Sequence, residues 1–327
     1  MQARPLKTIL YPDQNHVSCL TKARIGLKVY PDVGAHYLDL YDALLDAIRQ
    51  NTLVCPMSSF HIDESALDTR LEPKLHDTLA ELSYGTEFLF WVDILQRQVI
   101  AALHRYFRAP PPESQTRWEA VFNRDPNEPY VRSSGPIRAS RIGSLLEVQR
   151  AAKLIHERRG NTPASRGFQA QKRAMARELT WVVYRGPWQN LRNQNFGLLA
   201  AGSDKYLRLQ VAVANLTGKN NEAFVDEQLD RFLESDELVG VPFVDIYSSL
   251  RAAMASDENR RPKGSDLQDV LIAATVMPYG GVFATDSYVK DLAQRLKLDK
   301  QYNVSVFGGR KADVLALAAL VRELTGR

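Results

Sequence analysis

Residues 265 to 307, SDLQDVLIAATVMPYGGVFATDSYVKDLAQRLKLDKQYNVSVF, decide the fold class. The stretch reads as a helix over 265–278, a buried strand over 280–285, a second helix over 286–298 and a strand over 302–307. Short apolar strands that alternate with helices indicate a parallel sheet covered by helices. An amphipathic helix over 311–324 follows. We therefore expect an α/β fold.

The beginning of the chain shows the same alternation. A strand is expected at 8–11, a helix at 37–50, a strand within TLVCPMSS at 52–59, a helix opened by HIDESAL at 61–67, and a long apolar helix within 88–107. The alternation stops at APPPES, 109–114, and resumes near the C-terminus. This organisation predicts one α/β domain in two halves, 1–108 and 241–327, separated by a mostly helical basic insert over 109–240.

Composition limits the protein class. The 327 residues are 45% hydrophobic and 24% charged, as in soluble globular proteins. No apolar run approaches the ~20 residues of a membrane span, and no secretory signal is evident, so we expect a cytoplasmic protein without a membrane partner. The sequence lacks the GxxxxGK[ST], GxGxxG, GxSxG and HExxH motifs. Nucleotide-driven motors and serine hydrolases are therefore not expected.

The charge is unevenly distributed along the chain. The net charge is +4, but residues 131–220 contain 16 Lys or Arg against 4 Asp or Glu, a local balance of +12. Such an excess favours a polyanionic partner, because Lys and Arg displace the counterions of phosphates. Nucleic acid is the expected partner. The predicted contacts are Arg158, Arg159, Lys172 and Arg173.

Carboxylates follow several of the predicted strands. Asp13 follows the first strand, Asp63 and Glu64 follow the second, and Asp286 follows the strand at 280–285. The carboxyl ends of parallel strands share one sheet edge, where α/β proteins bind ligands. Each acid also has a structural explanation, as a turn residue or a helix N-cap. Several carboxylates at one edge would repel one another unless a cation were present, and they suit Mg²⁺ or Mn²⁺.

These motifs resemble those of the PIN-like nuclease superfamily. The matching pieces are YPDQN (11–15), HIDES (61–65), SDLQD (265–269) and VFATD (282–286). The similarity covers roughly 5–105 and 240–325, and it differs from small PIN proteins because more than a hundred residues separate its halves. It implies a PIN-like (Rossmann-like) parallel sheet flanked by helices, and a nuclease that depends on Mg²⁺ or Mn²⁺.

Carried over by position, the resemblance implies a set of site residues. The catalytic metal ligands would be Asp13, Glu64, Asp266 and Asp286, with Asp269 as an additional ligand and with Asn15 and Thr285 orienting the ligands through hydrogen bonds. Asp63 and Glu64 are adjacent, so only one can point inward, and we favour Glu64 for its longer reach. His16 and His61 are expected to be hydrogen-bonded structural residues.

The prediction is a ribonuclease that hydrolyses phosphodiester bonds, with RNA preferred over DNA. One alternative is a catalytically inactive PIN-like protein that binds nucleic acid or acts as a scaffold. Another is a toxin or phage-defence effector that a protein partner or inhibitor holds inactive. The apolar C-terminal helix, ADVLALAALV at 312–321, is a candidate interface for a homo-oligomer.

Overall fold

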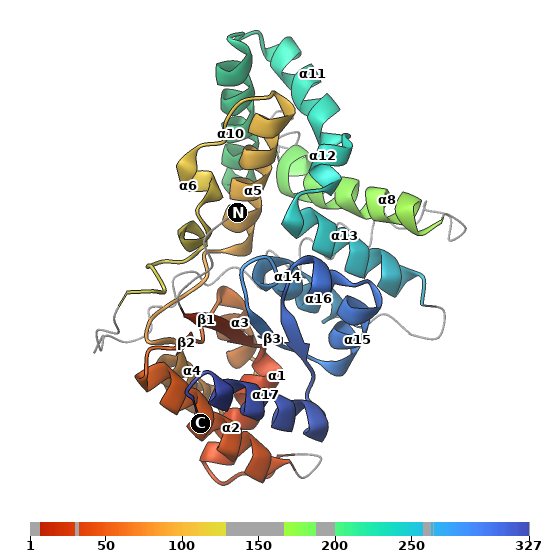
Figure 1. Ribbon diagram of the computed structural model, residues 1–327. Coiled ribbons are helices and arrows are strands. Elements are labelled where there is room, and N and C mark those ends of the chain that lie inside the picture. Colours follow the sequence, from red (N-terminus) through yellow and green to blue (C-terminus); the bar gives the residue numbers. More distant parts are fainter. Residues whose placement is uncertain are drawn as a thin grey trace. The chain divides into compact units, whose positions relative to one another are not determined.

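The chain forms two compact units. The structure, a computed structural model, describes residues 7–29, 33–128, 167–187, 200–257, 263 and 265–326, with the side chains of 200–203 excepted (Figure 1). Unit 1 consists of Met1–Phe90, Trp118–Leu145 and Val276–Arg327, and unit 2 of Trp91–Arg117 and Leu146–Thr275. These divisions differ from the boundaries expected at 108 and 240.

Unit 1 is built on a four-stranded sheet in the order β2-β1-β3-β4, in which every pairing is parallel. The strands are β1 (Thr8–Pro12), β2 (Leu53–Val54), β3 (Val282–Ala284) and β4 (Ser305–Phe307). Tyr11 pairs with Phe283, and Phe283 pairs in turn with Val306. The expected α/β class with a parallel sheet is confirmed. The two central strands, β1 and β3, come from opposite ends of the sequence.

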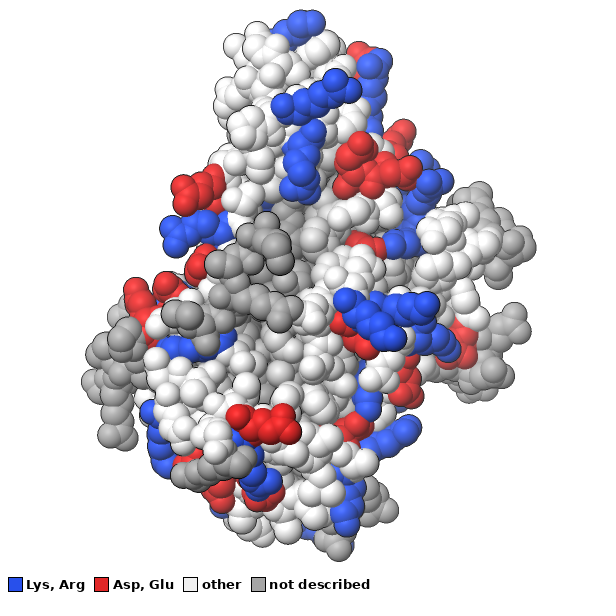
Figure 2. Space-filling model, in the orientation of Figure 1, with Lys and Arg blue, Asp and Glu red and all other residues white. Residues whose placement is uncertain are grey.

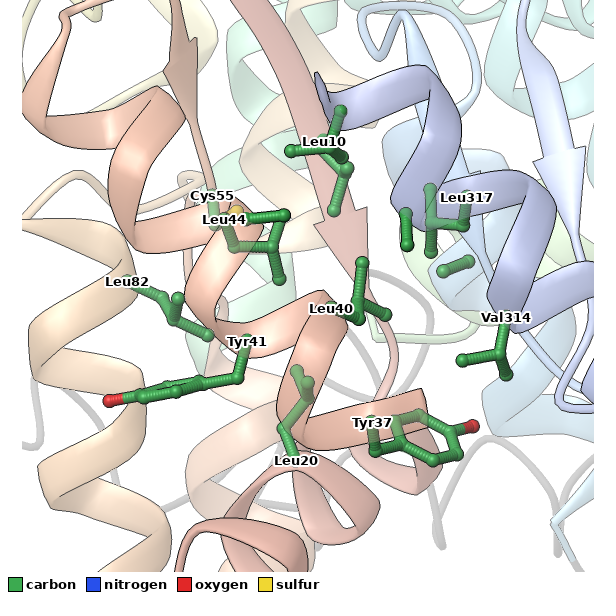
Figure 3. Close-up of a cluster of buried hydrophobic side chains, with 14 of the residues drawn as sticks. Leu10, Leu20, Tyr37, Leu40, Tyr41, Leu44, Cys55, Leu82, Val314 and Leu317 are labelled. Carbon is green, nitrogen blue, oxygen red and sulfur yellow. The ribbon is translucent and has the colours of Figure 1, made fainter. Parts of the chain in front are cut away.

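Helices surround this sheet in unit 1. They are α1 (Gln14–Arg24), α2 (Gly34–Arg49), α3 (Ser59–Ser65), α4 (Glu72–Ser83), the short η1 (Trp118–Val121), α15 (Ser287–Arg295), α16 (Leu298–Gln301) and α17 (Lys311–Glu323). Both faces of β1 are covered: Leu10 joins a cluster formed with α2 and α17, while the Tyr11 ring contacts Phe88 and Phe283. Figure 3 shows Leu40, Leu44 and Leu317 pointing into the same cluster as Leu10. Burial on both faces explains why β1 is apolar throughout rather than alternating.

The segment after η1 belongs to unit 1, although the sequence placed it in the insert. Phe122 forms an antiparallel bridge with Phe88, and their rings lie 4.5 Å apart between centroids. The Lys7 ammonium donates to the carbonyl oxygen of Glu128 at 2.8 Å. The chain thus returns to unit 1 before the basic segment begins.

Unit 2 is helical. Its described elements are α5 (Trp91–Tyr106), α6 (Glu113–Thr116), α8 (Phe168–Thr180), η3 (Trp181–Arg185), α10 (Ala200–Thr217), α11 (Glu222–Leu233), α12 (Asp236–Val239), α13 (Pro242–Ala255) and most of α14 (Asp266–Val276). The α5 helix is apolar because it packs inside this unit: Trp91 stacks on Phe243, whose backbone N–H donates to Gln98 Oε1 at 2.7 Å. None of the described helices combines the length and apolarity needed to cross a bilayer.

Candidate functional site

Two of the predicted acids stand at the carboxyl ends of the two central strands. Asp13 directly follows β1 and caps α1, with its Oδ1 accepting the backbone N–H of His16 at 3.0 Å. Asp286 follows β3 and caps α15, with its Oδ1 accepting the N–H groups of Tyr288 and Val289 at 2.7 and 2.8 Å. Both carboxylates are therefore fixed by helix N-termini at the same sheet edge.

Asp13 lies in a costly electrostatic position. Its side chain is buried, and the pKa of its carboxyl is raised, first by the loss of solvent and then by the negative charge of Asp286. Three interactions lower the pKa of Asp13: the electrostatic interaction with His16, the hydrogen bond from the His16 backbone, and the hydrogen bond from the Thr285 side chain. Asp13 and Asp286 follow the paired strands β1 and β3, so they lie at the same sheet edge, as the sequence predicted. A bound cation would offset the unfavourable charge of the buried Asp13 carboxylate.

His16 and Tyr37 connect the acid pair to its surroundings. The His16 ring is buried; its Nε2 donates to the Thr285 carbonyl oxygen at 3.2 Å, and its Nδ1 lies 3.3 Å from the Tyr37 hydroxyl. A carbonyl oxygen can only accept, so Nε2 carries the proton. The Thr285 side chain also bonds Asp13, as expected for a residue that orients it. His16 is the structural, hydrogen-bonded residue that we expected.

His61 also supports the end of β1. Its Nε2 donates to the Pro12 carbonyl oxygen at 2.7 Å, and its Nδ1 accepts the N–H of Ser58 at 3.1 Å. The ring stacks on Tyr11, whose hydroxyl lies 2.6 Å from Ser58 Oγ. Burial lowers the pKa of His61 to about 4, so the imidazole is neutral near pH 7. The residue before Asp13 is thereby held in place by an uncharged histidine.

The structure corrects the position of Glu64. The α3 helix begins at Ser59, and Ser58 is its N-cap. Glu64 therefore lies in the last turn of α3 and not in the first turn as expected. The strand β2 ends at Val54, earlier than TLVCPMSS suggested, and leaves room for the helix to begin sooner. Asp63 is the more buried of the two acids, at 8% exposure. Burial raises the pKa of the Tyr11 hydroxyl, and the charges of Glu64 and Asp13 add to that effect. That Glu64 joins the acid pair stays a prediction.

The remaining predicted acids belong to unit 2. Asp266 is buried in the first turn of α14, and its Oδ2 accepts the N–H of Lys263 at 2.8 Å. Asp269 lies in the same turn and is half-buried. That these two acids join Asp13 and Asp286 stays a prediction. Asn15 lies in the first turn of α1 and is exposed, and no described residue hydrogen-bonds its side chain.

Sequence reasoning missed an ion pair at the end of β4. Asp313, in the first turn of α17, pairs with Lys290 of α15, and both side chains are mostly buried. Gly308 leaves space for this pair, because a Cβ there would meet Asp313 Oδ2 at 2.8 Å and Ser287 Oγ at 3.1 Å. The charge of Asp313 also contributes to the raised pKa of Tyr37, after burial, Cys19 and Asp13. The rule that identified Asp13 and Asp286, an acid that follows a strand, applies equally to Asp313.

The donor chemistry of the acid pair fits a hard divalent cation. No group of three His, Cys, Asp or Glu side chains at metal-binding spacing occurs among the residues that the structure describes. Mg²⁺ does not require such a cage, because it commonly binds one or two carboxylates and completes its shell with water and substrate phosphate. Asp13 and Asp286 meet that lower requirement.

The predicted nucleic-acid contacts are only partly covered by the structure. The Lys172 ammonium is mostly buried and pairs with Asp245, while Arg173 Nη2 pairs with Asp236 at 2.9 Å. Arg158 and Arg159 lie outside the described residues. Among the described residues on the face in Figure 2, basic and acidic side chains are interspersed. Lys172 is thus occupied within the protein, and the role of all four residues in binding stays a prediction.

Comparisons with protein-family models, with curated proteins and with solved structures give no match to this chain. The likeness to PIN-like nucleases therefore stays a prediction from the sequence motifs.

Proposed function

We propose that this protein is a nuclease that depends on Mg²⁺ or Mn²⁺ and hydrolyses phosphodiester bonds, with RNA as the preferred substrate. The observation that carries the proposal is the pair Asp13 and Asp286, which stand at the carboxyl ends of two adjacent parallel strands, with Asp13 buried. α/β proteins bind ligands at this edge of the sheet, and carboxylates there are suitable ligands for a hard cation.

In this proposal the residues of unit 1 bind and orient. Asp13 and Asp286 hold the cation, which supplies an activated water and stabilises charge on the phosphate oxygens. Thr285 fixes the Asp13 carboxylate by a hydrogen bond, and His16 fixes the strand end next to it through the Thr285 carbonyl. Glu64, Asp266 and Asp269 are the further acids proposed for the site.

The alternative is a protein that binds nucleic acid or acts as a scaffold without catalysis. One observation favours it: Asp13 and Asp286 are each an N-cap, a role that requires no cation. An effector controlled by a protein partner remains a further proposal. Asparagine separates the capping role from the metal-binding role, because it caps helices as well as aspartate does but lacks the negative charge.

The test is cleavage of labelled single-stranded RNA, structured RNA and DNA in Mn²⁺, Mg²⁺ or EDTA. We expect metal-dependent cutting by the wild type and a loss of roughly a hundredfold or more in Asp13→Asn and in Asp286→Asn. Asp77→Asn, in an exposed part of α4, is the matched control and should cut normally. Cutting at the wild-type rate by both site variants would refute the proposal, and RNA binding without cutting in Mn²⁺ and in Mg²⁺ would favour the scaffold.

A further inference from the structure

Unit 2 contains a buried arginine to which no described residue provides a counter-charge. Arg251, in α13, exposes 6% of its surface, and its Nε is buried without a hydrogen-bond partner. Among the residues that the structure describes, none forms an ion pair or a hydrogen bond with its guanidinium. Lys7 is the other cation among the described residues that is buried to this degree, and its ammonium donates to the carbonyl oxygen of Glu128. Arg251 is therefore unusual within this protein.

Other cations of unit 2 show how this fold normally neutralises charge. Lys172, Arg185 and Lys205 are all partly buried, and each pairs with a carboxylate from a different helix, namely Asp245, Asp230 and Asp93. Arg251 lacks such a partner even though it is buried. An ion that is buried without a counter-ion loses hydration that no partner replaces, and buried charges in proteins are normally paired.

Local features of α13 do not replace the missing counter-ion. Arg251 lies four positions before Ala255, the last residue of the helix. At that distance from the C-terminus the helix dipole stabilises a cation only weakly. Residues 243 to 254 of the helix are all buried, and the acid among them is Asp245. This acid already pairs with Lys172. The charge of Arg251 thus lacks compensation within the described part of the unit.

We propose that Arg251 anchors an anion site in unit 2 whose ligand is a phosphate group. The planar guanidinium matches two phosphate oxygens at once. Of its three nitrogens, only Nε is both buried and unbonded, so the terminal nitrogens retain access to solvent and to a ligand. Residues 131–220, most of which belong to the same unit, carry the local balance of +12 that attracts phosphates. The phosphate belongs to a nucleic-acid backbone or to a free phosphate compound.

Binding measurements on the full chain in EDTA test this proposal without relying on cleavage. The probes are inorganic phosphate, uridine monophosphate and a short single-stranded RNA, titrated by calorimetry into the wild type, Arg251→Met, Arg251→Lys and the control Arg177→Met. Arg177 is an exposed arginine of α8. Arg251→Met should weaken binding by roughly thirtyfold or more, because it removes a hydrogen-bonded buried charge from the site. Arg251→Lys should retain part of the affinity, and Arg177→Met nearly all of it.

The outcomes distinguish the source of the phosphate. Dependence on Arg251 for RNA alone identifies a nucleic-acid backbone, whereas dependence for all three probes identifies free phosphate. Equal binding of every probe by wild type and Arg251→Met overturns the proposal. Thermal unfolding in phosphate-free buffer gives a second way to overturn it. If Arg251→Met has a lower midpoint than the wild type and Arg251→Lys does not, the protein itself contains a counter-charge for this residue. A failed nuclease assay leaves these measurements unaffected.

Discussion

Acid should destabilise unit 1 through His61. The unfolded imidazole takes up a proton near its ordinary pKa of 6.5, whereas burial lowers the folded value to about 4. Between these two pH values the unfolded state binds more protons, so the free energy of unfolding falls as the pH falls. The contribution of the neutral His61 to the free energy of unfolding is complete above pH 6.5 and is lost by about pH 4. At 1.36 kcal/mol per pH unit, the loss approaches roughly 3 kcal/mol.

His61→Gln isolates this effect. The glutamine oxygen can accept the N–H of Ser58 at the same helix position but cannot titrate. At pH 7 the variant should be less stable by about 1 kcal/mol, because the bond to the Pro12 carbonyl is lost. That deficit should shrink and then reverse as the pH falls towards 4. Asp13 titrates with the opposite sign, since its raised pKa favours the native state in acid, but it contributes equally to both proteins.

The assay is urea unfolding at several pH values between 7 and 4, followed by circular dichroism. Ser58→Ala is the matched control: it loses the hydroxyl contact with Tyr11 but keeps the backbone N–H and the imidazole. Its stability should be lower at every pH and should change with pH as the wild type does. Parallel curves for wild type and His61→Gln would show that His61 does not carry the acid sensitivity, and the argument from burial would be wrong.

Three further predictions concern stability in urea unfolding. Gly308→Ala should cost about 1–3 kcal/mol, since its Cβ would lie 2.8 Å from a carboxylate oxygen, whereas Gly309→Ala, with its nearest contact at 3.7 Å, should be nearly neutral. Leu317→Ala should cost about 2–5 kcal/mol because Leu317 is 1% exposed, while Leu315→Ala on the same helix, at 41%, should change little. Asp13→Ala should be less stable than Asp13→Asn by about 1 kcal/mol, because alanine cannot cap α1; equal stabilities would contradict the capping geometry.

The sequence predicted the parts of the fold that depend on local patterns. Alternating apolar strands and helices gave the parallel sheet, and the strand ends located Asp13 and Asp286. Glu64 was assigned to the wrong turn because β2 has two residues and the helix starts behind Ser58, which apolarity alone does not reveal. The end of unit 1 at Phe90 was missed as well, because a long apolar helix looks the same in either unit.

The sequence did not predict which residues pair across long separations in the chain. Lys172 was expected to bind nucleic acid, but its carboxylate partner, Asp245, lies 73 positions away. The burial of Arg251 likewise depends on tertiary packing, because arginine is among the residues that are least often fully buried. Charge counts predict the kind of partner, whereas the side chains left free to bind it appear only in three dimensions.

The pairing of β1 with β3 also fixes when the acid pair can exist. Leu10 pairs with Val282, so the ribosome must make some 270 residues after β1 before its neighbour appears. At roughly 5–20 residues per second, that interval is about a quarter of a minute to a minute. Throughout it, the β3 side of β1 has no partner strand, and an unpaired strand edge can pair with another chain. A site that needs both acids therefore forms only in chains whose synthesis has passed residue 286.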